Sequence, residues 1–242
     1  MDVSTLLVAA VIFAATYLQS ATGFGLALVC MAVIPLVIPV EDAIACVAIA
    51  SFFVNFFIFF ANRAGFSFRK ALPLSIGIIL GIPIGYYALR GLDGKMIIRL
   101  LGIALMAISA WDFIQGRFAS KFVIPEKAGG VFGLIGGVLA GAFNVGGPPI
   151  VVYTYSRPWA KVEAVAILQT VFIAGGTTRN LLMVHEGEYT RELLTMVGWS
   201  LPGCLVAVWL GKLTLDRVPQ VLLRKIVFAL IFFIGLRYVI SP

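Results

Sequence analysis

The chain repeats much of its own pattern 122 residues further on, at about half of its 242 residues. The matching pairs include Gly25 and Gly147, Glu41 and Glu163, and Gly81 and Gly203. A long apolar chain built from two like halves is typical of membrane transporters. The pattern predicts one integral membrane domain made of two repeats, 1–120 and 121–242.

Composition places this chain in lipid. Hydrophobic residues make up 61% and charged residues 12% of it, whereas soluble domains carry about 45–50% and about 25%. The net charge of +7 would suggest a nucleic-acid partner in a soluble protein, but here Lys and Arg lie in short loops. We therefore expect the lipid bilayer, and no nucleic acid, as a partner. Backbone groups in lipid need internal hydrogen bonds, so the expected class is an all-α polytopic membrane protein.

Six apolar segments have the length of ordinary membrane-spanning helices, roughly 20 residues. They lie near 42–60, 71–89, 96–115, 162–183, 193–211 and 220–240. Two further segments, 3–39 and 128–159, are different because glycine or proline interrupts each near its middle, at 22–25 and at 144–149. As one straight helix the first would run about 55 Å, nearly twice the ~30 Å hydrocarbon core. Each repeat is therefore expected to hold a broken, re-entrant or twice-crossing pair of short helices and three transmembrane helices.

Loop charges predict the orientation. If each broken segment returns to its starting side, one side carries about twice as many Lys and Arg residues as the other. The richer side holds Arg63, Arg69, Lys70, Arg117, Lys121, Lys127, Arg157, Lys161, Lys212 and Arg217, and the poorer side holds mainly Arg90, Lys95, Arg99, Arg191 and Arg237. We take the richer side as cytoplasmic. The second repeat is then inverted relative to the first, and both termini lie outside.

The two breaks are the best candidates for a site. A broken helix leaves unpaired N–H groups at the start of its second part, and the helix dipole makes that end attractive to anions. In an inverted repeat two such breaks meet near the midplane. Neutral polar side chains gather at them: Gln19, Ser20, Thr22 and Asn144. The alternative is that small residues only let helices pack closely.

Polar residues inside other helices form a second group of candidates. Asn55 and Thr177 occupy matching repeat positions, and each either binds substrate or makes a hydrogen bond that joins helices. Arg179 could attract an anion, but we favour an interfacial position, as is more common for such an arginine. Arg157 follows the second break and is either a cytoplasmic gate or, as we prefer, an anchor on the positive side.

No residue pattern in the chain indicates catalysis. Cys30, Cys46 and Cys204 lie inside apolar segments and are odd in number, so we expect neither a disulfide nor a metal site. A zinc-protease helix, a P-loop and a Ser/His/Asp arrangement are all missing from the sequence. We expect no enzyme, no cofactor and no bound metal.

The breaks carry a family resemblance. Ala21-Thr22-Gly23-Phe24-Gly25, with Pro35 downstream, resembles the first-half motif of the sulfite exporter TauE/SafE family. Asn144-Val145-Gly146-Gly147-Pro148-Pro149 resembles its second-half motif, and the likeness covers nearly the whole chain. It implies an inner-membrane permease for sulfur-containing oxyanions: sulfite, sulfoacetate or other organosulfonates.

We therefore expect a secondary transporter that exports a small sulfur-containing anion by alternating access, one half-bundle rocking against the other. The rivals are a small-anion channel and a membrane assembly factor that transports nothing. Backbone N–H groups near four glycines would bind the oxyanion, and two phenylalanines would close the cavity. The expected substrate-binding residues are Gln19, Ser20, Thr22, Gly23, Phe24, Gly25, Asn55, Phe143, Asn144, Gly146, Gly147, Pro148, Thr177 and Arg179. The sequence leaves open which anion is carried, the direction, the coupling ion and whether the protein is a homodimer.

Overall fold

The computed structural model describes residues 3–118, 124–214 and 220–242, and the elements in these ranges are all helices. Six of them are long and apolar enough to cross a membrane. These candidate spans are Val3–Thr22, Val40–Gly65, Phe68–Ala88, Gly94–Phe113, Glu126–Phe143 and Arg191–Leu213. The expected all-α polytopic class is therefore confirmed.

Six long helices occupy the apolar segments singled out in the sequence, with bounds that differ by a few residues. They are α3 (Val40–Asn62), α4 (Phe68–Ala88), α5 (Gly94–Phe118), α8 (Lys161–His185), α9 (Arg191–Thr214) and α10 (Gln220–Ile240). Pro39 precedes α3, and Glu41 and Asp42 lie in its first turn. Acidic side chains at that end complement the positive pole of the helix dipole.

The other two segments are interrupted where glycine and proline predict. The first forms α1 (Val3–Thr22) and α2 (Leu26–Val33), followed by the 3₁₀ turn η1 (Ile34–Leu36). The second forms the 3₁₀ turn η3 (Glu126–Ala128), α6 (Gly129–Phe143) and α7 (Gly147–Ser156). The expectation of two short helices is wrong for the first segment, because α1 has 20 residues and, at ~1.5 Å per residue, is about as long as the bilayer core is thick.

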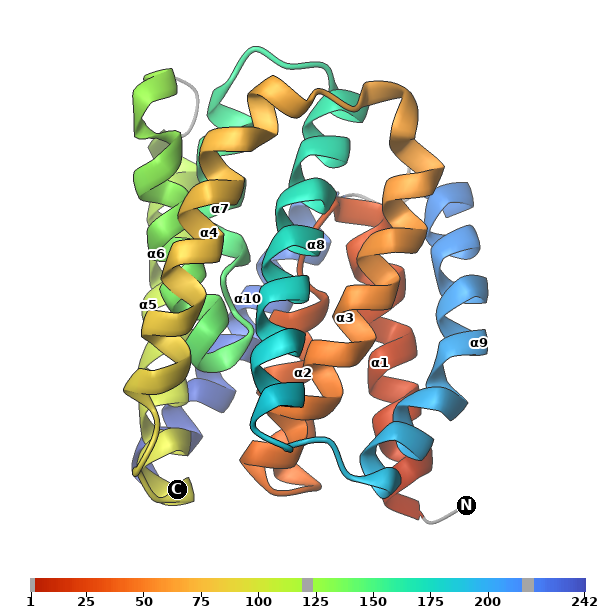
Figure 1. Cartoon of the computed structure of the whole chain (residues 1–242), viewed down its shortest axis with the longest axis vertical. Coiled ribbons are helices and arrows are strands. Elements are labelled where there is room, and N and C mark those ends of the chain that lie inside the picture. The colour runs from red at the N-terminus through yellow and green to blue at the C-terminus, as the bar shows by residue number, and fades with distance from the viewer. Residues whose placement is uncertain (1–2, 119–123, 215–219) are drawn as a thin grey trace.

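Backbone angles show why the chain turns at these places. Gly23 and Gly25 have φ of +88° and +114°, and Asn144 has φ of +60°. Glycine adopts this left-handed region freely, and Asn tolerates it better than most residues. After each turn the short helix heads back: α2 towards the end where α1 begins, and α7 towards the end where α6 begins (Figure 1).

Most of the closely packed helix pairs join one helix of the first half to one helix of the second half. α1 lies along α9, α4 along α6, α5 along α10, and α3 along α8, while α3 also contacts α9 and α4 contacts α8. If α1–α5 correspond in order to α6–α10, each contact has its mirror counterpart, as an internal twofold relation would require. The inverted repeat stays a prediction, and its boundary at 120/121 lies outside the described residues.

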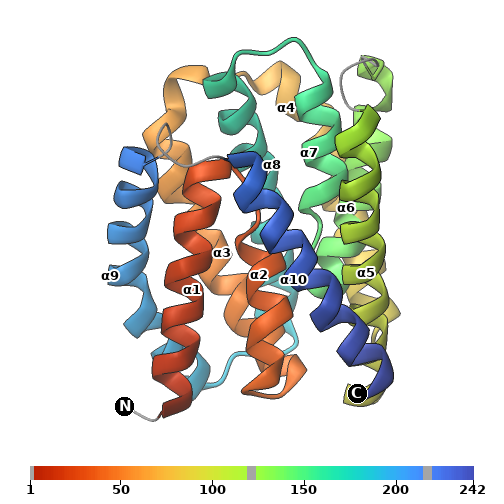
Figure 2. The same ribbon diagram turned by 180° about the vertical axis from the view of Figure 1, so that it is seen from behind.

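Both chain ends lie at the same end of the bundle (Figures 1 and 2). The connections from α3 to α4, which includes η2 (Arg63–Gly65), and from α7 to α8 lie at the opposite end (Figure 1). This opposite end therefore carries the loops that the sequence describes as rich in positive charge. Lys121 and Arg217 lie outside the described residues, and which end faces the cytoplasm stays a prediction.

Glycines bring α4 and α6 into direct backbone contact. The seam between them is formed by Gly77, Gly81 and Gly85 on α4 and by Gly133, Gly137 and Gly141 on α6. A Cβ atom on Gly137 would lie 2.6 Å from the carbonyl oxygen of Ile78, closer than real Cβ contacts allow. Small residues that let backbones approach are a common means of joining helices in membranes. Close helix packing, which the sequence analysis considered as the alternative role of small residues, is therefore the role of the glycines in this seam.

Candidate functional site

A cavity of about 70 Å³ lies between the two helix breaks. Phe24 and Gly25 line it from the first break, and Asn144, Gly146 and Gly147 line it from the second. A single water already fits in roughly 10–15 Å³ measured in this way. The breaks therefore face a common space that is large enough for a small polyatomic ion.

Neutral amides hold the first break. Gln19 Nε2 donates to Asn55 Oδ1 at 2.6 Å, and Gln19 Oε1 accepts from the Leu26 N–H at 3.0 Å. Gln169 Nε2 donates to the Gly23 carbonyl at 2.8 Å. All three polar side chains are buried. Asn55 therefore makes the hydrogen bond between helices that the sequence suggested, joining α3 to α1, and it also lines the cavity, while substrate binding by Asn55 stays a prediction.

The start of α2 offers hydrogen-bond donors to the cavity. Gln19 occupies the Leu26 N–H, and the first backbone bond runs from Val29 to the Gly25 carbonyl at 3.0 Å. The N–H groups of Gly25, Ala27 and Leu28 have no acceptor within the described part of the chain, and all three residues line the cavity. Unpaired N–H groups at a helix start favour an anion.

The second break has fewer donors, because Pro148 and Pro149 follow Gly147 in the first turn of α7 and proline has no N–H. Asn144 ends α6, and its Nδ2 donates to the Ile44 carbonyl of α3 at 2.7 Å. This bond ties the break to the first half of the molecule.

Arg179 supplies a charge at this second break. Only 3% of it is exposed, and it lines the cavity. Its Nη1 donates to the carbonyls of Ala140 and Gly141 at the end of α6, the negative pole of that helix. The Tyr86 ring centroid lies 5.9 Å from the guanidinium carbon, and the buried Nε has no acceptor among the described residues. The interfacial position that the sequence favoured for Arg179 is wrong, because α6 provides acceptors inside the bundle.

Eight of the expected binding residues line the cavity: Gln19, Phe24, Gly25, Asn55, Asn144, Gly146, Gly147 and Arg179. Six are absent from its described lining: Ser20, Thr22, Gly23, Phe143, Pro148 and Thr177.

Local hydrogen bonds explain why three of these six residues do not line the cavity. The Ser20 hydroxyl donates to the Val208 carbonyl on α9 at 2.8 Å. The Thr22 hydroxyl lies near backbone carbonyls at the break, 2.8 Å from Leu18 and 2.7 Å from Phe24. Thr177 is exposed and bonds to its own helix, so matching repeat positions do not give it the role of Asn55.

Sequence reasoning missed most of the α8 wall. Phe172, Gly175 and Gly176 line the cavity with Arg179, and their spacing of i, i+3, i+4 and i+7 places them on one helix face. That spacing was available in the sequence. Gln169 lies on the same helix, but its bond to the first break depends on tertiary packing and could not be predicted from the sequence.

Polar contacts join the halves at the end that holds the chain termini. The Tyr86 hydroxyl donates to Glu188 Oε1 at 2.5 Å, and Arg90 pairs with Glu186. These contacts connect the end of α4 to the turn between α8 and α9. The hydrogen bond from Arg90 holds the pKa of the Glu186 carboxyl below its usual range.

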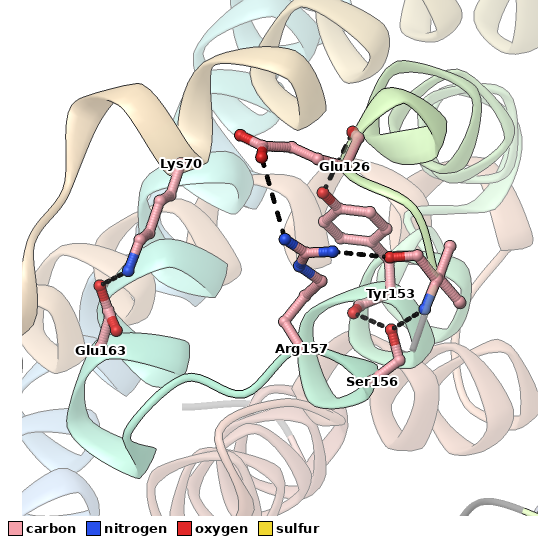
Figure 3. Close-up of polar contacts among 7 residues, drawn as sticks. Lys70, Glu126, Tyr153, Ser156, Arg157 and Glu163 are labelled. Carbon is pink, nitrogen blue, oxygen red and sulfur yellow. Dashed lines mark hydrogen bonds and ion pairs between the residues drawn. The ribbon is translucent and has the colours of Figure 1, made fainter. Parts of the chain in front are cut away.

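A second polar cluster lies at the opposite end of the bundle, where α4 and α8 begin (Figure 1). Figure 3 shows its contacts. Lys70 Nζ lies 2.5 Å from Glu163 Oε1 and joins α4 to α8. Arg157 Nη1 donates to the Ile124 carbonyl at 2.8 Å, and its Nη2 lies 3.9 Å from Glu126. Arg157 therefore holds the chain before α6 and is absent from the described cavity lining.

Comparison with known proteins now gives the family. A sequence model described as "Sulfite exporter TauE/SafE" matches residues 8–238. The chain belongs to the sulfite exporter TauE/SafE family. It is 25% identical over 231 residues, covering 93% of this chain and 90% of the relative, to a "Probable sulfite/organosulfonate exporter TauE" of Cupriavidus necator. No solved structure gives a significant match. As a TauE/SafE family member with six candidate spans, the chain is a multi-pass membrane transporter, and its relative is named as an exporter and not as an enzyme.

Proposed function

We propose that the protein is a secondary transporter that exports a small sulfur-containing oxyanion, sulfite or an organosulfonate such as sulfoacetate, across the inner membrane by alternating access. The observation that carries this proposal is the cavity between the two breaks, with a buried guanidinium on one side and unpaired N–H groups on the other. The family and the relative's name support the sulfur oxyanion as substrate. Both termini are proposed to lie on the periplasmic side.

In this proposal the anion binds between α2 and α8. Its oxygens accept from the N–H groups of Gly25, Ala27 and Leu28, while Arg179 faces it from the second break. Hydrogen bonds between an ion and donors are stronger than those between neutral groups, and more so in a site with little water. Most donors are uncharged, so the anion can still be released.

Alternating access is supported by contacts between α4 and α8, or the turn after α8, at both ends of the bundle. Tyr86–Glu188 and Arg90–Glu186 lie at one end, and Lys70–Glu163 lies at the other. Each set joins α4 to α8 or to the turn that follows it. Opening one set while the other stays closed would connect the cavity to one side of the membrane at a time.

Purified protein in liposomes loaded with sulfite tests this function. Release should saturate as the internal concentration rises. An inside-negative potential should speed it, because moving a monoanion outward gains about 2.3 kcal/mol per 100 mV. Flux that rises without saturation would indicate the small-anion channel instead. Absence of flux for sulfite and for organosulfonates would refute the transporter and favour the assembly factor.

A further inference from the structure

We infer that the cavity accepts a single negative charge, so that its guest is the monoanion: hydrogensulfite or a compound with one sulfonate group. Compact dianions that carry both charges on one group of oxygens, such as sulfate and fully deprotonated sulfite, are rejected, whereas an organosulfonate whose second charge lies on a separate group is disfavoured to a lesser degree. This inference rests on the proposed function, in which the cavity is the anion site.

The charge of the cavity comes from one side chain. Among the described residues that line it, Arg179 alone is ionisable. Its guanidinium is almost fully buried, with Nη1 on the α6 carbonyls and Nε without an acceptor in the described ranges. A buried cation whose side chain lines a cavity attracts one anionic oxygen there.

The helix dipoles add almost nothing to the net charge that the cavity offers to a guest. Each break brings together the end of one helix and the start of another: α1 with α2, and α6 with α7. The poles carry roughly −0.5 and +0.5 of a charge, so the two pairs nearly cancel. The net charge offered to a guest is therefore close to that of Arg179 alone.

Neighbouring titratable groups do not add a second cation. Tyr86 from α4 stacks near Arg179, and its hydroxyl donates to Glu188. Glu188 is exposed, so its carboxylate is solvated by water. Tyr189 donates to Asn180, and Arg90, beyond Tyr86, pairs with Glu186. A dianion in the cavity would thus keep one charge uncompensated where water is scarce, which is strongly unfavourable.

The test compares three anions on purified wild-type protein by calorimetry, from one pH unit below neutrality to one unit above. Methanesulfonate remains a monoanion throughout, sulfate remains a dianion, and hydrogensulfite loses its proton in this range. We expect methanesulfonate affinity to stay constant and sulfite affinity to fall towards roughly tenfold per pH unit once the dianion dominates. Sulfate should bind at least about 100-fold more weakly than methanesulfonate. Sulfoacetate, with a second charge on its carboxylate, should fall between the two.

The possible results separate this inference from the proposed function. Sulfate binding as tightly as methanesulfonate, or sulfite binding more tightly as the pH rises, would overturn the single-charge inference and leave anion transport standing. A loss of methanesulfonate affinity across the same range would overturn it too, since a protein group would then set the charge. Failure of methanesulfonate, sulfite and sulfate alike to bind would instead refute the proposed site.

Two variants give an independent check. Arg179→Lys retains the charge and should still prefer methanesulfonate over sulfate, although with weaker binding. Arg179→Gln should lose methanesulfonate affinity by at least about 100-fold. The wild-type pH series keeps the inference testable if Arg179→Gln does not fold. A folded Arg179→Gln that binds methanesulfonate normally would contradict the inference.

Discussion

The two helix breaks occupy matching places in the sequence but are stabilised by different chemistry. At the first, Gln19 and Gln169 bond to the backbone as neutral amides. At the second, the charged Arg179 caps the carbonyls of α6, and Asn144 ties the turn to α3. The first break keeps three free N–H groups, whereas at the second Pro148 and Pro149 have none to offer, and only those of Gly146 and Gly147 stay free among the described residues that line the cavity. Duplication thus supplies the same interruption twice, and side chains that differ between the halves stabilise the two copies differently. In the proposed site the first break would offer mainly hydrogen bonds and the second mainly charge.

The largest expected effect comes from comparing the glycine packing of α4 in the first half with that of α9 in the second half. Gly81 on the seam and Gly203 on α9 are repeat-related, but only Gly81 faces a backbone. A Cβ on Gly81 would lie 2.8 Å from the Val138 nitrogen, whereas on Gly203 the nearest atom is a Phe13 ring carbon at 3.5 Å. Gly81→Ala should lower the free energy of unfolding by about 2–4 kcal/mol through overpacking. Gly203→Ala should be neutral or stabilising by up to about 1 kcal/mol. Thermal unfolding in detergent measures both, and equal effects would show that the halves are supported alike.

A second pair of variants tests whether repeat position or cavity position decides function. Asn55 lines the cavity, while its repeat partner Thr177 is exposed. Asn55→Leu should reduce sulfite transport by about 10- to 100-fold, because a buried polar partner of Gln19 and of the anion is lost. Thr177→Val should change transport less than about twofold. Uptake into inverted vesicles provides the rates. Equal losses would restore Thr177 to the binding site.

Gln169 offers a test of the first break alone, because it bonds to the Gly23 carbonyl but is absent from the described cavity lining. Gln169→Leu leaves that buried carbonyl unpaired and should lower the free energy of unfolding by about 1–3 kcal/mol. Because α2 then loses its fixed position, we also expect KM for sulfite to rise more than kcat falls. An unchanged melting temperature would mean that neutral amides do not stabilise this break.

The smallest effect is expected at the Arg90–Glu186 pair, which is solvent-accessible. The pKa of Glu186 is lowered by Arg90. The pair therefore contributes stability above the unfolded-state pKa of the carboxyl, and this is lost as the pH falls through the lower folded-state value. Arg90→Gln should remove this acid-dependent part of the melting temperature. A profile identical to wild type would show that water already screens the pair.

Sequence patterns predicted the helical class, six long helices and both breaks, because these follow from apolar length and from backbone chemistry. The side to which each polar side chain points was harder to predict. Arg179 was expected at the interface because isolated arginines reach water, and only the packing of α6 beside α8 reveals carbonyls for it inside. Ser20 and Thr22 were expected in the cavity, but the Ser20 hydroxyl bonds to α9 and that of Thr22 to the backbone at the break.

The glycine seam restricts how the molecule can move. α4 comes from the first half and α6 from the second, yet their backbones touch along three successive turns, and interlocked surfaces of this kind resist sliding. A movement of one complete half against the other would separate α4 from α6 and break this backbone contact. If the protein works by the proposed alternating access, its rigid bodies would each combine helices from both halves, with α4 and α6 moving together. The hinge would then lie within each half and not at the junction between them.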